Sequence, residues 1–111
     1  MGDWVVIVEH HSEGRGESRE VIGGAGGTKE QALGVLRALV HTYLPRPRIV
    51  EKRRQVYRFA DRESYAVLIQ GTVTQWHCTL RIAELVSDSA DPGVAWRAQA
   101  ADTPPGHPDA R

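Results

Sequence analysis

The chain has 111 residues, fourteen basic and fourteen acidic side chains and a formal net charge of zero, and 41% of its residues are hydrophobic. This length allows one domain and a tail, with a core of modest size. The single cysteine, Cys78, excludes an internal disulfide framework. No apolar run follows a basic N-terminus, and no stretch approaches the roughly 18 apolar residues of a membrane span. We therefore expect a soluble protein of the reducing cytoplasm, without a signal peptide and without membrane contact.

The N-terminal segment predicts a β-hairpin. Residues 4–10, WVVIVEH, are apolar on both faces of a pleated strand, which is typical of an interior strand. Gly14 and Gly16 permit a turn, and residues 17–22 form the expected return strand.

The opening segment is also the basis of the one resemblance that the sequence offers. Residues 4–19, WVVIVEHHSEGRGESR, resemble small uncharacterised proteins of actinobacteria. The resemblance implies no function.

Residues 23–27, GGAGG, predict a flexible break before a helix. They do not match a phosphate-binding P-loop, because Thr28 stands between Gly27 and Lys29. A plain linker is favoured over a weak anion site at the helix start. Thr28 and Gln31 have the spacing of a capping box, so the helix is expected to run from there to about residue 44, before Pro45.

The expected helix has two distinct sides. Its polar stripe comprises Glu30, Gly34, Arg37 and His41. The opposite side, which is expected to face the core, comprises Ala32, Leu36, Leu39, Val40 and Tyr43.

The second half of the chain predicts three more strands and a tail. Residues 49–59 form a strand with charges in its middle, residues 65–70 are apolar on both faces, and residues 75–86 alternate. In the last of these, one face carries Trp76, Cys78, Leu80 and Ile82. Residues 88–111 are rich in proline, alanine and aspartate, and they are expected to be a flexible tail.

The expected fold is an α+β domain over residues 1–87 in the order ββαβββ. It has an antiparallel sheet of about five strands and one helix packed across one face. The first and fourth strands are expected in the interior, and the basic third strand at an edge. One helix covers only one sheet face. The other face is left for sheet curling, for a tail docking through Val94 and Trp96, or for a second copy in a homodimer.

The sequence predicts no catalytic residue, no metal and no cofactor. His10 and His11 are neighbours on a strand and point to opposite faces, and the same holds for His77 and Cys78. Each pair therefore offers one ligand per face. Cys78 is in register with apolar residues and is expected to be a small core residue.

The most informative feature is charge clustering, since seven of the fourteen basic residues lie within residues 46–62. Such a cluster in a neutral chain favours a selective surface. It fits edge protection, an acidic protein partner, or a nucleic acid with Tyr57 or Phe59 stacking on a base. We expect a non-catalytic adaptor or regulatory module that binds a protein, with nucleic-acid binding as the alternative. The candidate binding residues are Arg46, Arg48, Lys52, Arg53, Arg54, Tyr57 and Arg58.

Overall fold

The computed structural model describes residues 3–12 and 16–102. Across these residues the chain forms five strands and two helices. In chain order they are β1 (Asp3–Ser12), β2 (Glu17–Gly27), α1 (Lys29–Leu39), β3 (Arg53–Arg58), β4 (Ser64–Gln70), β5 (Gln75–Leu85) and α2 (Gly93–Asp102).

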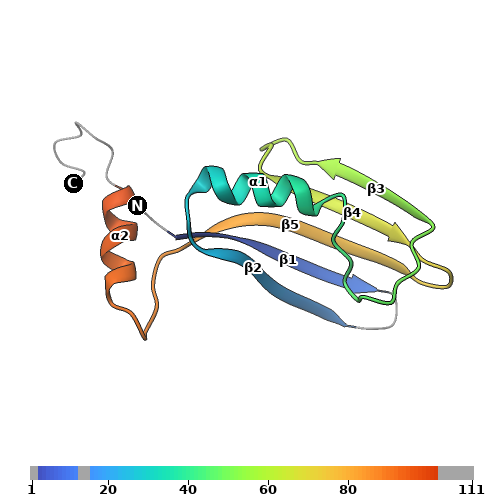
Figure 1. Cartoon of the computed structure of the whole chain (residues 1–111), viewed down its shortest axis with the longest axis horizontal. Coiled ribbons are helices and arrows are strands. Elements are labelled where there is room, and N and C mark those ends of the chain that lie inside the picture. The colour runs from blue at the N-terminus through green and yellow to red at the C-terminus, as the bar shows by residue number, and fades with distance from the viewer. Residues whose placement is uncertain (1–2, 13–15, 103–111) are drawn as a thin grey trace.

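The strands form one antiparallel sheet in the order β2-β1-β5-β4-β3 (Figure 1). This confirms the α+β class and the five-stranded antiparallel sheet. β1 and β4 each lie between two neighbours, as their two-sided apolar patterns predict. The basic strand β3 lies at an edge, as expected.

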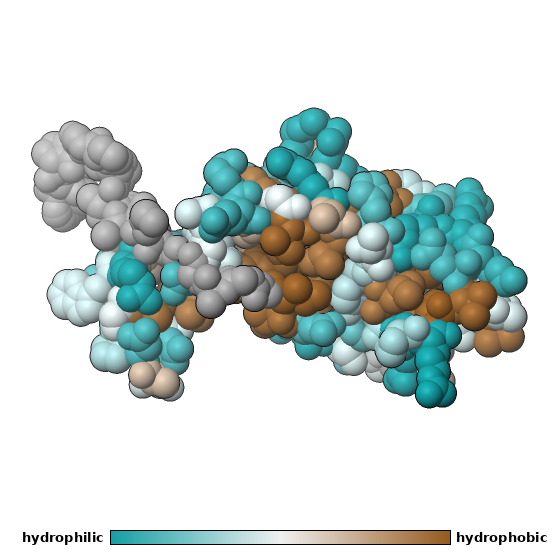
Figure 2. Space-filling view, in the orientation of Figure 1, coloured by the Kyte–Doolittle hydropathy of each residue, from teal (hydrophilic) through white to brown (hydrophobic). Residues whose placement is uncertain are grey.

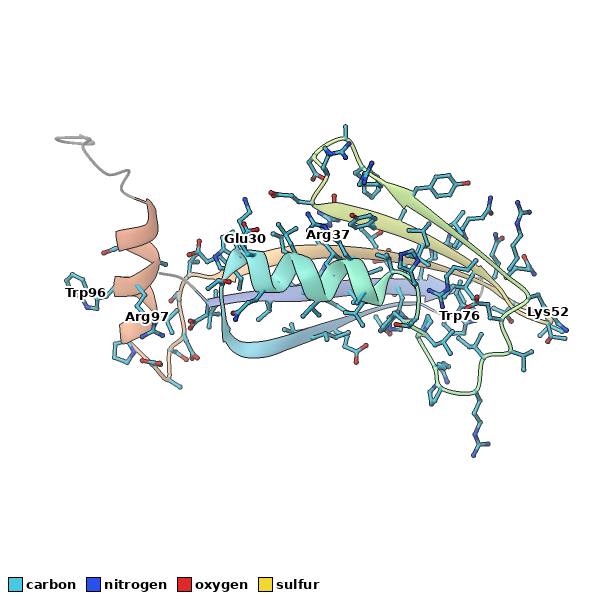
Figure 3. All side chains as sticks on the ribbon, turned by 45° about the horizontal axis from the view of Figure 1, so that its top comes forward. Glu30, Arg37, Lys52, Trp76, Trp96 and Arg97 are labelled. Atoms are coloured by element: carbon cyan, nitrogen blue, oxygen red, sulfur yellow. The ribbon has the colours of Figure 1, made fainter. Side chains whose placement is uncertain are left out.

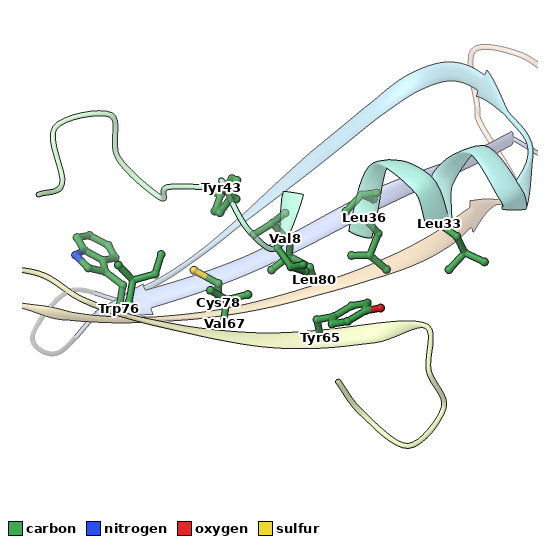
Figure 4. Close-up of a cluster of buried hydrophobic side chains, with 12 residues drawn as sticks. Val8, Leu33, Leu36, Tyr43, Tyr65, Val67, Trp76, Cys78 and Leu80 are labelled. Carbon is green, nitrogen blue, oxygen red and sulfur yellow. The ribbon is translucent and has the colours of Figure 1, made fainter. Parts of the chain in front are cut away.

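The core lies between α1 and one face of the sheet, where α1 packs on β1, β5 and β2 (Figure 4). Strand alternation brings Val8, Leu80 and Val67 to this face, and all three are almost fully buried. From the helix, Leu36 is fully buried at 0% exposure, and Leu33, which was not predicted, is buried beside it. The expected core positions of α1 and β5 are therefore confirmed.

The capping box of α1 is present. The N–H of Gln31 donates to the Thr28 hydroxyl at 3.1 Å, and the N–H of Thr28 donates to Oε1 of Gln31 at 2.9 Å. The helix ends at Leu39 rather than near residue 44, and the chain continues in tight turns through Thr42. There the N–H groups of Thr42 and Tyr43 both donate to the carbonyl of Leu39, at 3.0 and 2.7 Å, which closes the last turn before Pro45.

The glycine-rich segment differs from the expected flexible break. It belongs to β2, because Gly27 pairs with Trp4 while Ile22 pairs with Val6, and the register shifts between these pairs. Glycine tolerates the backbone of such a bulge, so pairing with β1 overrides the local break signal. The expected turn at Gly14 lies outside the described residues.

Part of the segment that was expected to be a flexible tail is helical. The Pro92 ring at the helix start and the Asp91 carboxylate, which accepts from the N–H of Gly93 at 3.0 Å, favour a helix there. Val94 and Ala98, four residues apart and so on one face, are each 3% exposed. Of the two expected anchors, Val94 is therefore buried, whereas Trp96 is 74% exposed and does not dock. Residues 103–111 lie outside the described residues.

The two sides of α1 predict opposite costs of substitution. Leu36→Ala should lower the free energy of unfolding by about 2–5 kcal/mol, because a fully buried side chain leaves a cavity. Arg37→Ala, on the side turned away from the sheet, should change it by under about 0.5 kcal/mol (Figure 3). Urea denaturation of both variants is the measurement, and a larger cost for Arg37→Ala would show that the helix is rotated.

The docking of α2 is testable with two residues of one helix. Val94→Ala should destabilise the protein by roughly 1–2 kcal/mol, because it removes buried methyl groups. Trp96→Ala, although it removes a far larger side chain, should change stability by less than about 0.5 kcal/mol. Thermal unfolding of the two variants tests this prediction. Equal losses of stability would mean that α2 does not pack as described.

Candidate functional site

The edge strand β3 turns one row of its backbone groups away from the sheet. The N–H of Phe59 donates to the Ser64 carbonyl at 3.0 Å, which sets the hydrogen-bonded positions of the β3–β4 ladder. Because such positions alternate in antiparallel pairs, Tyr57, Gln55 and Arg53 bond to β4. The N–H and C=O groups of Arg54, Val56 and Arg58 therefore point outward. Within the described residues, no hydrogen bond engages them.

The side chains of β3 divide between the two faces of the sheet. Val56 is opposite Val67, which is buried under α1, so Arg54, Val56 and Arg58 lie on the α1 side. Arg53, Gln55 and Tyr57 lie on the other side, where the Gln55 amide donates to the Tyr57 hydroxyl at 3.1 Å. Arg53 therefore lies on the face opposite to that of Arg54 and Arg58.

Arg54 is not available to a partner. Its side chain is 9% exposed, and its guanidinium donates to the carbonyl oxygens of Val40 at 3.1 Å and Tyr43 at 2.8 Å. It also donates to the Glu51 carboxylate at 2.7 and 3.0 Å. Arg54 thus caps the end of α1 and fixes the following loop, and it leaves the set of candidate binding residues.

The other predicted basic residues lie in different surroundings. Arg46 places its guanidinium 5.9 Å from the centre of the Trp76 ring, a cation–π contact. Arg48 lines a shallow hollow of about 220 Å³ with Val50, Val73 and Trp76. Lys52 is exposed beside the start of β3 (Figure 3).

Unpaired positive charge therefore gathers along the edge. Among the described residues, ion pairs engage Arg54 but none engages Lys52, Arg53, Arg58 or Arg62. All four are exposed. Hydrophilic residues gather on the upper part of the end of the molecule where β3 begins, beside hydrophobic residues on its lower part, and a second hydrophobic area lies near the centre of the view (Figure 2). We call Lys52, Arg53, Tyr57 and Arg58, together with the outward backbone of β3, the basic edge.

Arg62 is a residue of this region that the candidate set did not include. It lies in the turn between β3 and β4 with a φ of 63°, in the left-handed region that non-glycine residues seldom adopt. Asp61 holds this turn by accepting from the backbone N–H of Glu63 and from the Ser64 hydroxyl, both at 2.9 Å. The Glu63 N–H and the Ser64 hydroxyl hold the pKa of the Asp61 carboxyl below its usual value. The sequence feature that could have identified Arg62 is a basic residue directly after Asp61, the residue whose side chain holds the turn.

The sheet face opposite α1 is a second candidate surface. Glu9 lies there between Arg19 at 2.6 Å and Arg81 at 3.1 Å, and the hydrogen bond from Arg19 is the main reason why the pKa of Glu9 is lowered. Val21, which is 62% exposed, lies on the same face. The face is thus a mixture of exposed apolar side chains and paired charges.

The histidines come together in the way that strand pairing requires. His11 and His77 stack on the face opposite α1, with ring centres 5.0 Å apart, while His10 is paired with Cys78 on the α1 face. In the described part of the chain, no group of three or more His, Cys, Asp or Glu residues is placed to hold a metal ion. Cys78 is a buried core residue, as expected, and burial raises the pKa of its thiol to about 11.

Neither helix in the described part of the chain is long and apolar enough to cross a membrane. Comparison with known proteins finds no matching family, no matching curated protein and no matching solved structure.

The role of Arg54 predicts a stability effect that its neighbour lacks. Arg54→Ala should lower the free energy of unfolding by about 2–4 kcal/mol, because charged hydrogen bonds to two part-buried carbonyls disappear. Arg53→Ala, which removes an exposed arginine one position away, should cost under about 0.5 kcal/mol. Chemical denaturation of both proteins is the check. Similar costs would place Arg54 among the surface arginines.

Proposed function

We propose that the protein is a non-catalytic adaptor or regulatory module that binds an acidic protein partner through its basic edge. The observation that carries the proposal is the edge itself. There, Lys52, Arg53 and Arg58 are exposed without an ion pair among the described residues, beside backbone groups that no described segment covers. Unpaired charges at an accessible surface favour complementary partners and speed their association.

Nucleic-acid binding is the alternative, because Tyr57 and Phe59 are 51% and 47% exposed and could stack on bases. Two observations favour a protein instead. Arg53 and Arg58 point to opposite faces, and Arg54 is used internally, so few cations share a surface on which a phosphate backbone could run. The formal net charge of zero also departs from the positive excess typical of nucleic-acid-binding domains.

A homodimer through the face opposite α1 ranks third. Val21 and Leu85 are exposed there, at 62% and 40%. A second copy would, however, bury the ion pairs of Glu9 with Arg19 and Arg81, and desolvating paired charges offsets much of the gain from apolar contact. The basic edge needs no such desolvation of existing pairs. Its partner would be met in the reducing cytoplasm, the compartment that a lone cysteine favours.

The test is a quantitative pull-down with single charge reversals. Arg53→Glu and Arg58→Glu should each lose the partner proteins that the wild type retains, since each places a negative charge at the basic edge. Arg37→Glu is the matched control, because Arg37 is an exposed arginine on α1, and it should retain them. Circular dichroism checks that all three variants fold.

Two results would contradict the proposal. The first is retention of the same proteins by all three variants. The second is direct binding of a labelled single-stranded DNA or RNA at physiological salt, with an affinity that falls steeply as salt rises. That result would favour the nucleic-acid alternative.

A further inference from the structure

We infer that the partner contributes an extended acidic segment, which adds to the sheet as a strand alongside β3; the inference rests on the proposed function and names the mode of binding. An exposed sheet edge binds an extended peptide through main-chain hydrogen bonds, and side chains at alternate positions supply the specificity. β3 offers both contributions.

The backbone of β3 is suited to strand addition. The strand is paired to β4 without a register shift over its six residues, and it contains no proline. The outward N–H and C=O groups of Arg54, Val56 and Arg58 lie at alternate positions, which is the spacing that a neighbouring strand requires. The other edge, β2, is broken by the register shift between Ile22 and Gly27, and such bulges discourage pairing. β3 is therefore the better template of the two edges.

The surroundings of β3 leave room for an added strand. α1 packs on β1, β5 and β2, and Figure 1 shows β3 beyond the helix, at the margin of the sheet. The loop from α1 reaches β3 at its first residues, where Arg54 binds the carbonyls of Val40 and Tyr43. Val56 and Arg58 follow this point of attachment. The loop is thus attached through the Arg54 side chain, and within the described residues no hydrogen bond engages the outward backbone of Arg54, Val56 or Arg58.

The side chains of β3 indicate which sequence the added strand carries. Arg53 and Arg58 stand near the two ends of β3 on opposite faces, and neither has an ion pair among the described residues. Carboxylates near both ends of the partner segment would face them, and cross-strand pairs of opposite charge stabilise a sheet. Between the arginines lie Val56 and Tyr57, which favour β-branched or aromatic neighbours. The expected segment is thus acidic at its ends and β-branched or aromatic in its middle.

The arginines of β3 also argue against a second copy at this edge. If two β3 strands paired antiparallel about a two-fold axis at Val56, the middle one of the outward positions, Arg54 of one copy would stand opposite Arg58 of the other, both on the α1 face. Like charges that face each other directly destabilise a sheet. The basic edge therefore disfavours pairing with the β3 strand of a second copy and favours an acidic strand.

A designed peptide tests the inference directly. The probe is a fluorescein-labelled peptide of about eight residues with glutamates at both ends and valine and threonine between them. Fluorescence anisotropy measures its affinity for the full-length protein. The first matched probe is the same peptide with N-methyl groups on alternate backbone nitrogens, which keeps the charge and removes the donors. The second has lysine in place of glutamate.

The matched protein variants are Val56→Pro and Val56→Ala. The N–H of Val56 points outward, so proline removes no β3–β4 bond but blocks a donor that an added strand would use. Alanine reproduces the loss of packing without blocking that donor. Val56→Pro should bind the acidic peptide about tenfold more weakly than Val56→Ala, because main-chain hydrogen bonds are lost. The N-methylated peptide should lose a similar factor on the wild type, and the lysine peptide should not bind.

The inference is overturned if folded Val56→Pro and Val56→Ala bind the acidic peptide equally. It is equally overturned if the N-methylated peptide binds the wild type as tightly as the unmodified one, a test that needs no variant. Failure of the wild type to prefer the acidic peptide over the lysine peptide overturns it as well. In the pull-down, a partner could be lost by Arg53→Glu and retained by Val56→Pro. That result would support the proposed protein binding at the basic edge and contradict binding by strand addition.

Discussion

The buried guanidinium of Arg54 connects the parts of the chain on which the candidate site depends. It joins the last turn of α1 through Val40, the loop through Tyr43 and Glu51, and β3 through its own backbone. A buried charge is tolerable only when its donors are satisfied, and here two carbonyls and a carboxylate satisfy them. The loop between α1 and β3, which has no periodic structure, is thereby held against the first residues of the edge strand.

This contact divides the arginines of one short segment into two roles. Arg54 points toward α1 and supports the fold, whereas Arg53, one residue earlier, points to the opposite face and stays exposed. Because Glu51 is paired with Arg54, it does not neutralise the exposed arginines by direct contact. The edge therefore keeps its positive charge in a chain whose net charge is zero. Edge protection and acidic-partner selection follow from the same charges, since they repel another copy and attract a complementary strand.

Strong local signals made much of the fold predictable. The alternation around Trp76 and Leu80 placed β5 and its buried face, and the Thr28–Gln31 spacing placed the start of α1. The charges of residues 46–62 placed an edge strand there. The helix α2 was not predicted, because residues 88–111 were interpreted from their composition alone as a flexible tail.

The rest depended on contacts between distant segments. The glycines of β2 signal a break, and only pairing with β1 reveals a bulged strand. Strand alternation alone suffices to put Arg54 and Arg58 on one face. The capping role of Arg54 could not be predicted, because it depends on the path of the loop after α1. Five of the seven predicted site residues lie in β3 or at the position before it. Four of these five are exposed in the structure, namely Lys52, Arg53, Tyr57 and Arg58.

Amide hydrogen exchange of the free protein, measured by NMR, tests most directly whether β3 is an open edge with a defined row of free donors. The N–H groups of Gln55 and Tyr57, which point to β4, should exchange slowly, and those of Val56 and Arg58 should exchange fast. This alternation along four consecutive residues is the predicted result. Uniform protection of all four amides, or slow exchange at Val56 and Arg58 instead, would mean that the edge is covered or differently paired, and would contradict the account.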